Sequence, residues 1–596
     1  MRIRNGFLFI VFLSLAACRG KETVVLPKTD ADNGGLFLPD GFGALVVADS
    51  VGLTRHLAVN DNGDIYVKMR IPTGDMGNIA LRDTTHDGKA DIFQRFGDYP
   101  NDGSFATEMR IHNGYIYFSS EQVVYRQKLT PSKLIPEGKP EVLLVDHHPI
   151  QWHNAKSLAF DNDGGMYVTF SAPTNACEDW ISTGGQPANV VGQFPCPQLI
   201  DQAGIWKFDE NKLGQSQAHG QRFAMGLRSI VAISWNAEDN SLYAVQHGRD
   251  YLYAHAPQYF SPWQSAVLPA EEFMKIKEGD DFGWPYTYYD PFKRKKMIAP
   301  EYGGDGIQEA IGLPYAAPLM GLPAHWSPND MLFYKGDQFP EHYQEGAFIA
   351  FHGSSNRAPF PQGGYIVAFI PFEDGKPTDT WEVFADGFAG VDTIATMEEA
   401  KYRPMGLAEG PDGSLYVSDS KKGKIWRIMF TGDPTQFGER QLVAMEKRKS
   451  RSYIKTPDGK ADNLSLRQAV DPGVLYKTYC LTCHQSEGQG DENINPPLAG
   501  SEWVNGKKED LIQTVLFGLQ GEIQVKNHTY NQIMPSFSFL SDEQLAAEIT
   551  YIKNNFGNHG DKVTPAEIKI RLSVTQIAIR KKENFSLVTF YCFSPR

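Results

Sequence analysis

The sequence is poor in three features that often reveal the class of a protein. Beyond one short apolar run at its start, no stretch of the 596-residue chain approaches the ~20 apolar residues that a transmembrane helix needs. It has no basic stripe, and its formal net charge is −14, which argues against a nucleic-acid partner because phosphate binding needs clustered Lys and Arg. It has only six cysteines, so each is interpreted from its position.

The composition is otherwise that of a globular protein. Hydrophobic residues at 41% and charged residues at 21% are ordinary values for such chains. The length predicts two to four domains. Aromatic residues at 12% and a total of 56 glycines favour many short strands and turns over long helices.

The first residues have the pattern of an export signal. Arg2 and Arg4 supply positive charge, and the apolar run from 7 to 15 has the length of a signal-peptide core. The run ends in Leu15-Ala16-Ala17-Cys18, a sequence that resembles a bacterial lipobox.

This resemblance implies a lipid-anchored protein. Residues 1–17 would be a lipoprotein signal peptide, Cys18 would be acylated, and residues 18–35 would form a tether. Several acyl chains give the stable membrane anchoring that one chain cannot. Because Arg19 rather than Asp follows the cysteine, the pattern favours the outer membrane of a bacterial cell envelope, on its periplasmic side. The alternative is an ordinary secretory signal with a chance cysteine.

Three further cysteines lie outside any recognisable motif. Cys177 and Cys196 are close together in a loop-like stretch, and the oxidising periplasm favours a disulfide between them. Cys592 lies in an unusual C-terminal tail, and we assign it no role.

One sequence phrase recurs along the chain, consisting of apolar residues, an Asp/Asn-Gly turn and a hydrophobic strand. Its copies are LAVNDNGDIYV (57–67), LAFDNDGGMYVTF (158–170), ISWNAEDNSLYAV (233–245), LAEGPDGSLYVSD (407–419) and, more loosely, MRIHNGYIYFS (109–119). Such turns between alternating apolar residues are a strong hairpin signal, because Asn, Asp and Gly accept positive φ. Repeated hairpins with long connections predict an all-β, six-bladed β-propeller over residues 36–430, with blades of ~65 residues. A pair of β-sandwiches is the alternative.

The remainder of the chain differs in character. Residues 431–470 are polar and charged without apolar periodicity, and we interpret them as a linker. Residues 471–560 are predicted to form a small all-α domain, in which Ser541 and Gln544 make a capping box at the start of a helix. Residues 561–596 fit neither domain, and this tail stays unassigned.

The most specific motif is Cys480-Leu481-Thr482-Cys483-His484, which has the C-x-x-C-H pattern of covalent haem c attachment. Two thiols on one helical turn reach the two vinyl groups of haem, and the adjacent histidine faces the iron. A zinc site would need a second pair of ligands, and the sequence has none. The motif therefore predicts electron transfer.

The second axial ligand of the iron should be a thioether or an imidazole downstream of the motif. Met534 follows His484 and precedes Pro535, just before the capped helix. This placement resembles a small class I cytochrome c, in which Met/His ligation raises the reduction potential. His528 is the rival ligand.

Six segments of the predicted propeller form an ordered set of motifs: WHNAKSLAFDNDGGMYVTFS (152–171), MGLRSIVAISW (225–235), QHGRDYLY (246–253), EGDDFGWPY (278–286), HGSSNR (352–357) and KYRPMGLAEGPDGSLYVSD (401–419). These motifs resemble the sorbosone/glucose dehydrogenase family. Each motif is weak alone, but together they follow the expected order along the chain. Members of this family are six-bladed quinoproteins that use pyrroloquinoline quinone (PQQ) and calcium, so the resemblance implies both cofactors here.

PQQ carries three carboxylates and two reactive carbonyls, so its pocket needs cations with planar, bidentate reach. The resemblance implies that Arg228, Arg357, Lys401 and Arg403 are these cations, on separate blades. Ser229, beside Arg228, stands where the glucose branch of the family has asparagine.

The resemblance also implies that His153 is the catalytic base. Oxidising a sugar hydroxyl needs a base near the carbinol proton while a hydride leaves the carbon, and imidazole has a pKa near the operating pH. A hairpin histidine bonded to backbone is the alternative. His325 is a further candidate for the pocket lining.

Calcium would polarise the quinone and hold it in place. The backbone carbonyls that bind calcium in the resembling family match Gly248 and Arg249, and hard calcium accepts carbonyl oxygen. A second candidate calcium loop has acidic residues at Asp83, Asp87 and Asp91 around a glycine turn. A plain turn is the alternative there.

Together these features predict a lipid-anchored quinohaemoprotein dehydrogenase. A sugar, polyol or aldehyde would be oxidised at PQQ in the propeller, and electrons would pass through haem c to a cytochrome or respiratory-chain acceptor. The chain differs from the family pattern at Trp152, Ser229 and His247. The alternative function is a catalytically silent, glycan-binding propeller fused to an electron-transfer cytochrome c domain.

Overall fold

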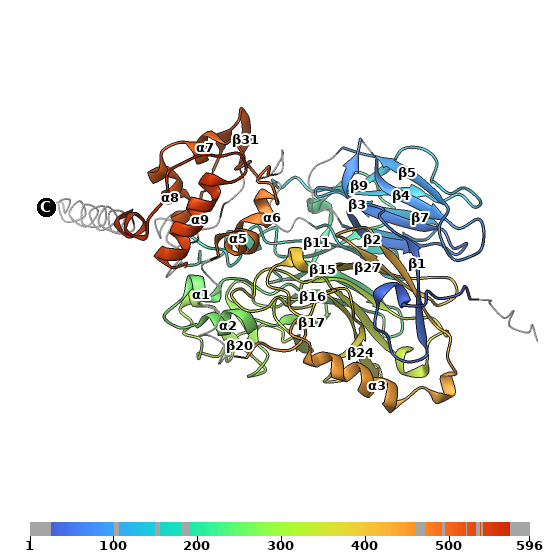
Figure 1. Cartoon of the computed structure of the whole chain (residues 1–596). Helices are drawn as coiled ribbons and strands as arrows, with labels where there is room; N and C mark the ends of the chain where they lie inside the picture. Colours follow the sequence, from blue (N-terminus) through green and yellow to red (C-terminus); the bar gives the residue numbers. More distant parts are fainter. Residues whose placement is uncertain are drawn as a thin grey trace, which may run out of the picture.

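The protein folds into a large β-propeller and a smaller C-terminal helical domain (Figure 1). The computed structural model describes all residues except 1–25, 75, 101–106, 150–154, 180–189, 459–470, 491–494, 520, 532–533, 535–536, 538–539 and 572–596. Within the described part of the chain, no helix combines the length and the apolar character needed to cross a membrane.

Six sheets of four or five strands make the blades of the propeller in the described residues. The first three blades consist of β2 (Thr54–Val59), β3 (Ile65–Thr73), β4 (Met76–Arg82) and β5 (Ile92–Asp98); β6 (Met109–His112), β7 (Tyr115–Ser119), β8 (Val123–Lys128), β9 (Glu141–Val145) and β13 (Gln215–Ser216); and β10 (Leu158–Phe160), β11 (Gly165–Phe170), β12 (Gly204–Asp209), β14 (Gln221–Met225) and β18 (Asp280–Asp281). The last three consist of β15 (Ile230–Asn236), β16 (Ser241–Gln246), β17 (Glu271–Ile276) and β21 (Met320–Leu322); β22 (Pro328–Phe333), β23 (Gly346–Phe351), β24 (Ile366–Glu373), β25 (Lys376–Pro377) and β26 (Glu382–Ala385); and β27 (Pro404–Glu409), β28 (Leu415–Asp419), β29 (Ile425–Phe430) and β1 (Phe42–Ala48). The predicted six-bladed propeller is confirmed.

The recurring sequence phrase forms the innermost hairpin of a blade. In each copy the apolar residues before the turn are the first strand and the residues after it are the second, as in β2 and β3, where Leu57 pairs with Val67. Five of the six blades have such a copy. The fifth blade has none, because β22 and β23 are joined by residues 334–345, which include a short 3-10 helix at Glu341–Tyr343.

The last blade closes the ring with strands from both ends of the propeller. β1 pairs antiparallel with β29, and Phe42 lies opposite Phe430. The ring of Phe42 makes edge contacts with Phe339 at 4.9 Å and Phe384 at 5.2 Å, between ring centroids. This pairing therefore joins the sixth blade to the aromatic core of the fifth.

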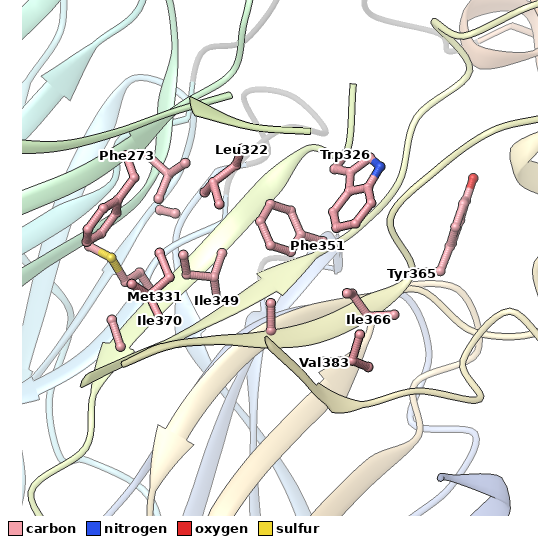
Figure 2. Close-up of a cluster of buried hydrophobic side chains, with 14 of the residues drawn as sticks. Phe273, Leu322, Trp326, Met331, Ile349, Phe351, Tyr365, Ile366, Ile370 and Val383 are labelled. Atoms are coloured by element: carbon pink, nitrogen blue, oxygen red, sulfur yellow. The ribbon is translucent and has the colours of Figure 1, made fainter. Parts of the chain in front are cut away.

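Apolar side chains fill the space between neighbouring blades, as Figure 2 shows for Phe273 of the fourth blade and Met331 and Ile349 of the fifth. There the fully buried Trp326 meets Phe351 edge-on, with ring centroids 5.1 Å apart. Burial of such large side chains is worth roughly 1.5–3 kcal/mol each, so cores of this kind hold the blades in fixed positions.

Residues 431–458 were expected to be part of a linker, and that prediction is wrong for this segment. Helix α3 (Glu439–Glu446) lies against β26, and Met445, Tyr453 and Ile454 are buried in the core of the fifth blade. Because the apolar residues here are too few for a visible period, the sequence pattern concealed this packing.

The C-terminal domain is mainly helical, as predicted, with one added hairpin. Its elements are α5 (Pro472–Leu475), a π-helical turn (Tyr476–Cys480), α6 (Leu481–His484), α7 (Glu502–Asn505), α8 (Lys508–Phe517), β30 (Ile523–Val525), β31 (His528–Tyr530) and α9 (Asp542–Asn554). The predicted capping box is confirmed, since the Gln544 amide donates to Ser541 Oγ at 3.2 Å and the Ser541 amide donates to Gln544 Oε1 at 2.9 Å.

Candidate functional site

A cavity of about 760 Å³ lies between the propeller and the C-terminal domain and is lined by residues of both. Figure 1 shows the C-terminal domain beside α1 (Leu252–His255) and α2 (Pro262–Val267), two short helices inserted in the fourth blade. Cavities of this size are typical of cofactor and substrate sites, so the two domains share one candidate site.

The blades present the starts of their innermost strands to this cavity. Because the first strands of propeller blades run in the same direction around the axis, their starts meet at one face. Every blade contributes a lining residue at or near the start of its first strand, namely Arg55, Thr107, Ala155, Arg228, Asn329 and Arg403.

Three arginines concentrate positive charge on the wall. Arg55, Arg70 and Arg403 all line the cavity. The pKa of Arg55 is lowered to about 9, first by burial and then by the positive charges of Arg70 and Arg403. Like charges brought together in a buried cavity repel one another, so this part of the wall favours a multiply charged anion.

Arg403 is held in place by the loop that follows β23. Its Nη2 donates to the Gly353 carbonyl at 2.5 Å and to His352 Nδ1 at 2.8 Å, and its Nε donates to the His352 carbonyl at 3.1 Å. Burial lowers the pKa of His352, and the nearby arginines lower it further, so His352 is neutral and accepts from Arg403. These bonds hold the guanidinium group of Arg403 at the wall.

Asp250 is the centre of a second polar group on the wall. Its carboxylate pairs with Arg228 Nη2 at 2.9 Å and with His325 Nδ1 at 3.1 Å, and it accepts from Asn356 Nδ2 at 2.7 Å. Glu271 lies beside this group, and burial raises the pKa of its carboxyl to about 7. The predicted place of His325 in the lining is confirmed.

Two of the predicted PQQ ligands do not reach the cavity. Arg357 is 1% exposed, and its Nε donates to the Ala324 carbonyl at 3.2 Å inside the fifth blade. A Cβ at Gly363 would lie 2.2 Å from Arg357 Nη1, so the guanidinium fills the space that this glycine leaves. Lys401 is exposed, with its ammonium 5.3 Å from the centroid of the Tyr402 ring. Arg357 and Lys401 are therefore not part of the candidate site.

Ser229 is also buried away from the cavity. Its Oγ lies 3.5 Å from Ser171 Oγ, and its carbonyl accepts from the His247 amide at 2.9 Å. The prediction that Ser229 contacts a cofactor is therefore wrong. Ser229 instead helps to position His247, which lines the cavity.

The loop with Asp83, Asp87 and Asp91 is a turn closed by its own backbone. Asp83 accepts from the amides of His86 and Gly88, both at 2.7 Å, and Asp91 accepts from the Thr84 amide at 2.8 Å. None of the described residues form a group of three or more His, Cys, Asp or Glu able to hold a metal ion. The predicted second calcium site is wrong.

The Gly248 carbonyl, which was predicted to bind calcium, already accepts a hydrogen bond from Arg228. The donor atom is Arg228 Nη1, at 2.8 Å, and Arg249 is not among the residues that line the cavity. A calcium ion at the Gly248 carbonyl would lie beside the positive guanidinium of Arg228, so the residues present do not fit the ion as they stand.

Several predicted residues lie outside the described residues or apart from the cavity. His153, Cys18 and Cys592 fall outside the described residues. The predicted disulfide between Cys177 and Cys196 is confirmed, and both cysteines are buried.

The haem-attachment residues line the other half of the cavity. Cys480, Cys483, His484 and Met534 all face it, whereas His528 is exposed on β31 and is not part of the lining. His484 Nδ1 lies 2.9 Å from the Pro496 carbonyl, and since a carbonyl only accepts, Nδ1 carries the proton. The lone pair of Nε2 is therefore available for iron, and Met534 rather than His528 is placed to be the second ligand.

Sequence reasoning missed Arg55 and Arg70. Arg55 precedes the hairpin phrase at 57–67, just as Arg228 and Arg403 precede the phrases in their own blades. That shared position was a usable signal for Arg55. Arg70 follows the end of the phrase, where β3 returns to the cavity, and no motif marks it.

Comparison with known proteins gives two family matches. Residues 36–431 match the family described as TrAA12-like, and residues 473–556 match cytochrome c. Cytochrome c-552 of Thermus thermophilus is 43% identical over 99 residues, which cover 16% of this chain and 66% of that protein, just under two thirds of its length. The fructose dehydrogenase cytochrome subunit of Gluconobacter japonicus is 29% identical over 449 residues, or 70% of this chain and 84% of that one.

A solved structure is similar over the propeller. The holo form of the pyranose dehydrogenase PQQ domain from Coprinopsis cinerea has a TM-score of 0.52 at 17% identity, over 66% of this chain and 97% of that one. At this identity the similarity concerns the fold alone.

Proposed function

Because this chain belongs to the TrAA12-like family over residues 36–431, we propose that it is an oxidoreductase that oxidises a sugar, polyol or aldehyde in the propeller and passes the electrons to its own cytochrome c domain. The observation that carries this proposal is the single cavity lined by the arginine cluster on one side and by the haem-attachment residues on the other. A glycan-binding propeller would have no need to share its cavity with a haem site.

The arginine cluster suits a cofactor with several carboxylates. Arg55, Arg70 and Arg403 would hold the carboxylates of PQQ, and their mutual repulsion is relieved when an anion lies among them. When bound, PQQ would accept the hydride that leaves the substrate carbon, and the two electrons of the oxidation travel with that hydride. The pyranose dehydrogenase domain from Coprinopsis cinerea, which has a similar propeller fold, is a PQQ domain, and this supports the choice of cofactor.

The polar group around Asp250 would orient the substrate hydroxyl. Arg228 and His325 hold the Asp250 carboxylate in one direction, and Asn356 adds a third contact. The carbinol proton needs a base, and we propose His153 for that role, as its position in the sequence motif implies. The neutral His352 holds Arg403 and does not take part in the proton transfer.

The cytochrome c domain would receive the electrons one at a time. Cys480 and Cys483 would attach the haem, and His484 and Met534 would bind its iron. The class of the final acceptor is a one-electron redox protein or a respiratory-chain component.

The experiment that tests this function follows the haem spectrum. The purified full-length chain with its haem is reconstituted with PQQ and mixed with aldoses, ketoses, polyols and aldehydes, and reduction of the haem is followed at its α-band. Reduction by at least one class is expected. If no substrate reduces the haem while a glycan binds in calorimetry, the silent glycan-binding propeller is the correct function.

Arg403→Ala is expected to weaken PQQ binding about 10- to 100-fold, because a charge-assisted hydrogen bond is worth roughly 1.5–3 kcal/mol. The matched control is Lys401→Ala, two residues away, which removes an exposed charge and should change the Kd less than twofold. Calorimetric titration of the PQQ-free protein with PQQ measures both. Equal losses in the two variants would contradict the assignment of Arg403 to the site.

We also propose that acylated Cys18 anchors the protein in the bacterial cell envelope, on the periplasmic side of the outer membrane. Cys18→Ser is expected to move most of the protein from the detergent phase to the aqueous phase in detergent phase partitioning of cell extracts, because the acyl chains are lost. Unchanged partitioning of the Cys18→Ser variant would contradict the lipid anchor.

A further inference from the structure

The segment from Gly248 to Tyr251 connects the two halves of the cavity. On the propeller side, the Gly248 amide donates to Glu271 Oε2 at 2.8 Å, and the Asp250 carboxylate pairs with Arg228. On the other side, Tyr251 lines the cavity together with Cys483 of the haem motif. The same short segment thus contacts the sugar-oxidising side and the haem side.

Tyr251 has a backbone conformation that needs support. Its φ is 64°, in the left-handed region that residues other than glycine rarely adopt, and it directly precedes α1. Such a residue costs on the order of 1 kcal/mol and persists where its surroundings hold it in place.

Asn175 supplies part of that support by clasping the backbone of Asp250. The Asp250 amide donates to Asn175 Oδ1, and Asn175 Nδ2 donates to the Asp250 carbonyl, both at 2.8 Å. Asn175 is itself fixed, because Trp284 Nε1 donates to its carbonyl at 2.9 Å and the buried Cys177 disulfide lies two residues away.

The other end of the segment is fixed by a buried triad of polar side chains. Glu301 pairs with Arg249 and accepts from His255 Nδ1 at 2.7 Å. Since Arg249 and His255 flank Tyr251, on either side of the turn into α1, the triad and the Asn175 clasp together hold the backbone at Tyr251 in one position.

Tyr251 lies on the side of the propeller that faces the cytochrome c domain. It directly precedes α1, which Figure 1 shows beside that domain. Cys483 and Tyr479 belong to the cytochrome c domain and line the same cavity. Tyr251 therefore shares one cavity with the polar group around Asp250 and with the residue that attaches the haem.

We infer that Tyr251 is the contact through which electrons pass from the propeller cavity to the haem attached at Cys483, an inference that rests on the function proposed above. Oxidation of one carbinol to a carbonyl releases two electrons and two protons. Each electron converts one ferric haem to the ferrous form, and a one-electron acceptor protein returns it to ferric before the second electron follows. The protons leave to water.

In this scheme the side chain of Tyr251 is neither oxidised nor deprotonated. Electron tunnelling weakens steeply with the width of the gap, so a packed aromatic ring in the space between donor and acceptor increases the rate. The ring, and not the hydroxyl, is the part of Tyr251 that matters.

The test compares Tyr251→Ala, Tyr251→Phe and Tyr259→Ala in the full-length protein with haem. Tyr259 is the matched control, because it lies between α1 and α2, is exposed and is not among the residues that line the cavity. With PQQ and substrate present, stopped-flow haem reduction is expected to slow at least tenfold in Tyr251→Ala and less than twofold in Tyr251→Phe and Tyr259→Ala. Reduction of a small soluble dye that takes electrons directly from the propeller is the internal reference.

A second measurement uses PQQ-free protein. The circular dichroism of the haem Soret band responds to aromatic rings beside the haem, so it should change in Tyr251→Ala and stay unchanged in Tyr259→Ala. If Tyr251→Ala does not fold, Asn175→Ala is expected to slow haem reduction relative to the dye by releasing the clasp.

The outcomes separate this inference from the proposed function. Wild-type protein that reduces neither dye nor haem with any substrate would overturn the proposed function, and the electron route with it. If substrate reduces the dye, and haem reduction in Tyr251→Ala or Asn175→Ala keeps pace with the wild type, only the role of Tyr251 is overturned.

Discussion

Met534→Ala is expected to lower the reduction potential of the haem by on the order of 0.1 V or more and to stop onward electron transfer. Axial ligands set haem potentials over a range of ~0.8 V, and a methionine thioether opposite histidine raises the potential. Met534 lines the haem half of the cavity with His484, whose Nδ1 is bonded to the Pro496 carbonyl. Spectroelectrochemical titration of the purified protein measures the shift.

The control for this prediction is His528→Ala. His528 is exposed on β31 and does not line the cavity, so its loss should leave the potential unchanged. A fall in potential for His528→Ala, with none for Met534→Ala, would show that the imidazole is the ligand and that the cytochrome c domain rearranges when it binds haem.

Glu301→Gln is expected to reduce the free energy of unfolding by about 3–5 kcal/mol at pH 7, because breaking a buried ion pair leaves its partner charge buried and uncompensated. The Glu301 side chain is 0% exposed and pairs with Arg249, which is 3% exposed, and with His255. Chemical denaturation of the wild type and the variant measures the difference.

The pH dependence of this effect has a definite sign. Burial alone would raise the pKa of Glu301, but Arg249 and His255 outweigh it and lower the pKa from 4.5 to about 2. A carboxyl with a lowered folded-state pKa stabilises the fold above its unfolded pKa, and this contribution is lost as the pH falls through the folded value. The difference between wild type and Glu301→Gln should therefore be largest at neutral pH and disappear between pH 4.5 and 2.

An exposed ion pair provides the control for Glu301. Lys295 and Glu309 pair at 2.7 Å, but their side chains are 53% and 28% exposed, so water screens them. Glu309→Gln should cost at most about 1 kcal/mol. A similar loss for both variants would mean that burial does not determine the strength of these pairs.

The architecture of the propeller could be predicted because its signal is local. A hairpin needs only a turn with positive φ between alternating apolar residues, and five inner hairpins carry it within 11 to 13 residues each. The fifth blade and α3 carry no such signal. In α3 most of the surface is polar, and only a few residues such as Met445 reach the core, so the sequence suggests a linker.

The candidate site was predicted less completely, since which way a side chain points depends on residues far away in sequence. Arg403 and Lys401 are two residues apart, yet one lines the cavity and the other is exposed. Arg357 turns into the blade because Gly363 leaves space there, which no local pattern reveals. The haem-attachment residues could be predicted from the sequence, because haem attachment itself requires this spacing of the two thiols and the histidine.

The pairing of β1 with β29 has a consequence for how the protein is made. Phe42 leaves the ribosome long before Phe430, its partner in the last blade, so β1 has an unpaired edge while the other five blades are synthesised. Contacts between such distant parts of a chain slow folding, so aggregation-prone intermediates persist for longer. The ring therefore closes only after β29 has been made, and until then the edge of β1 can pair with other chains.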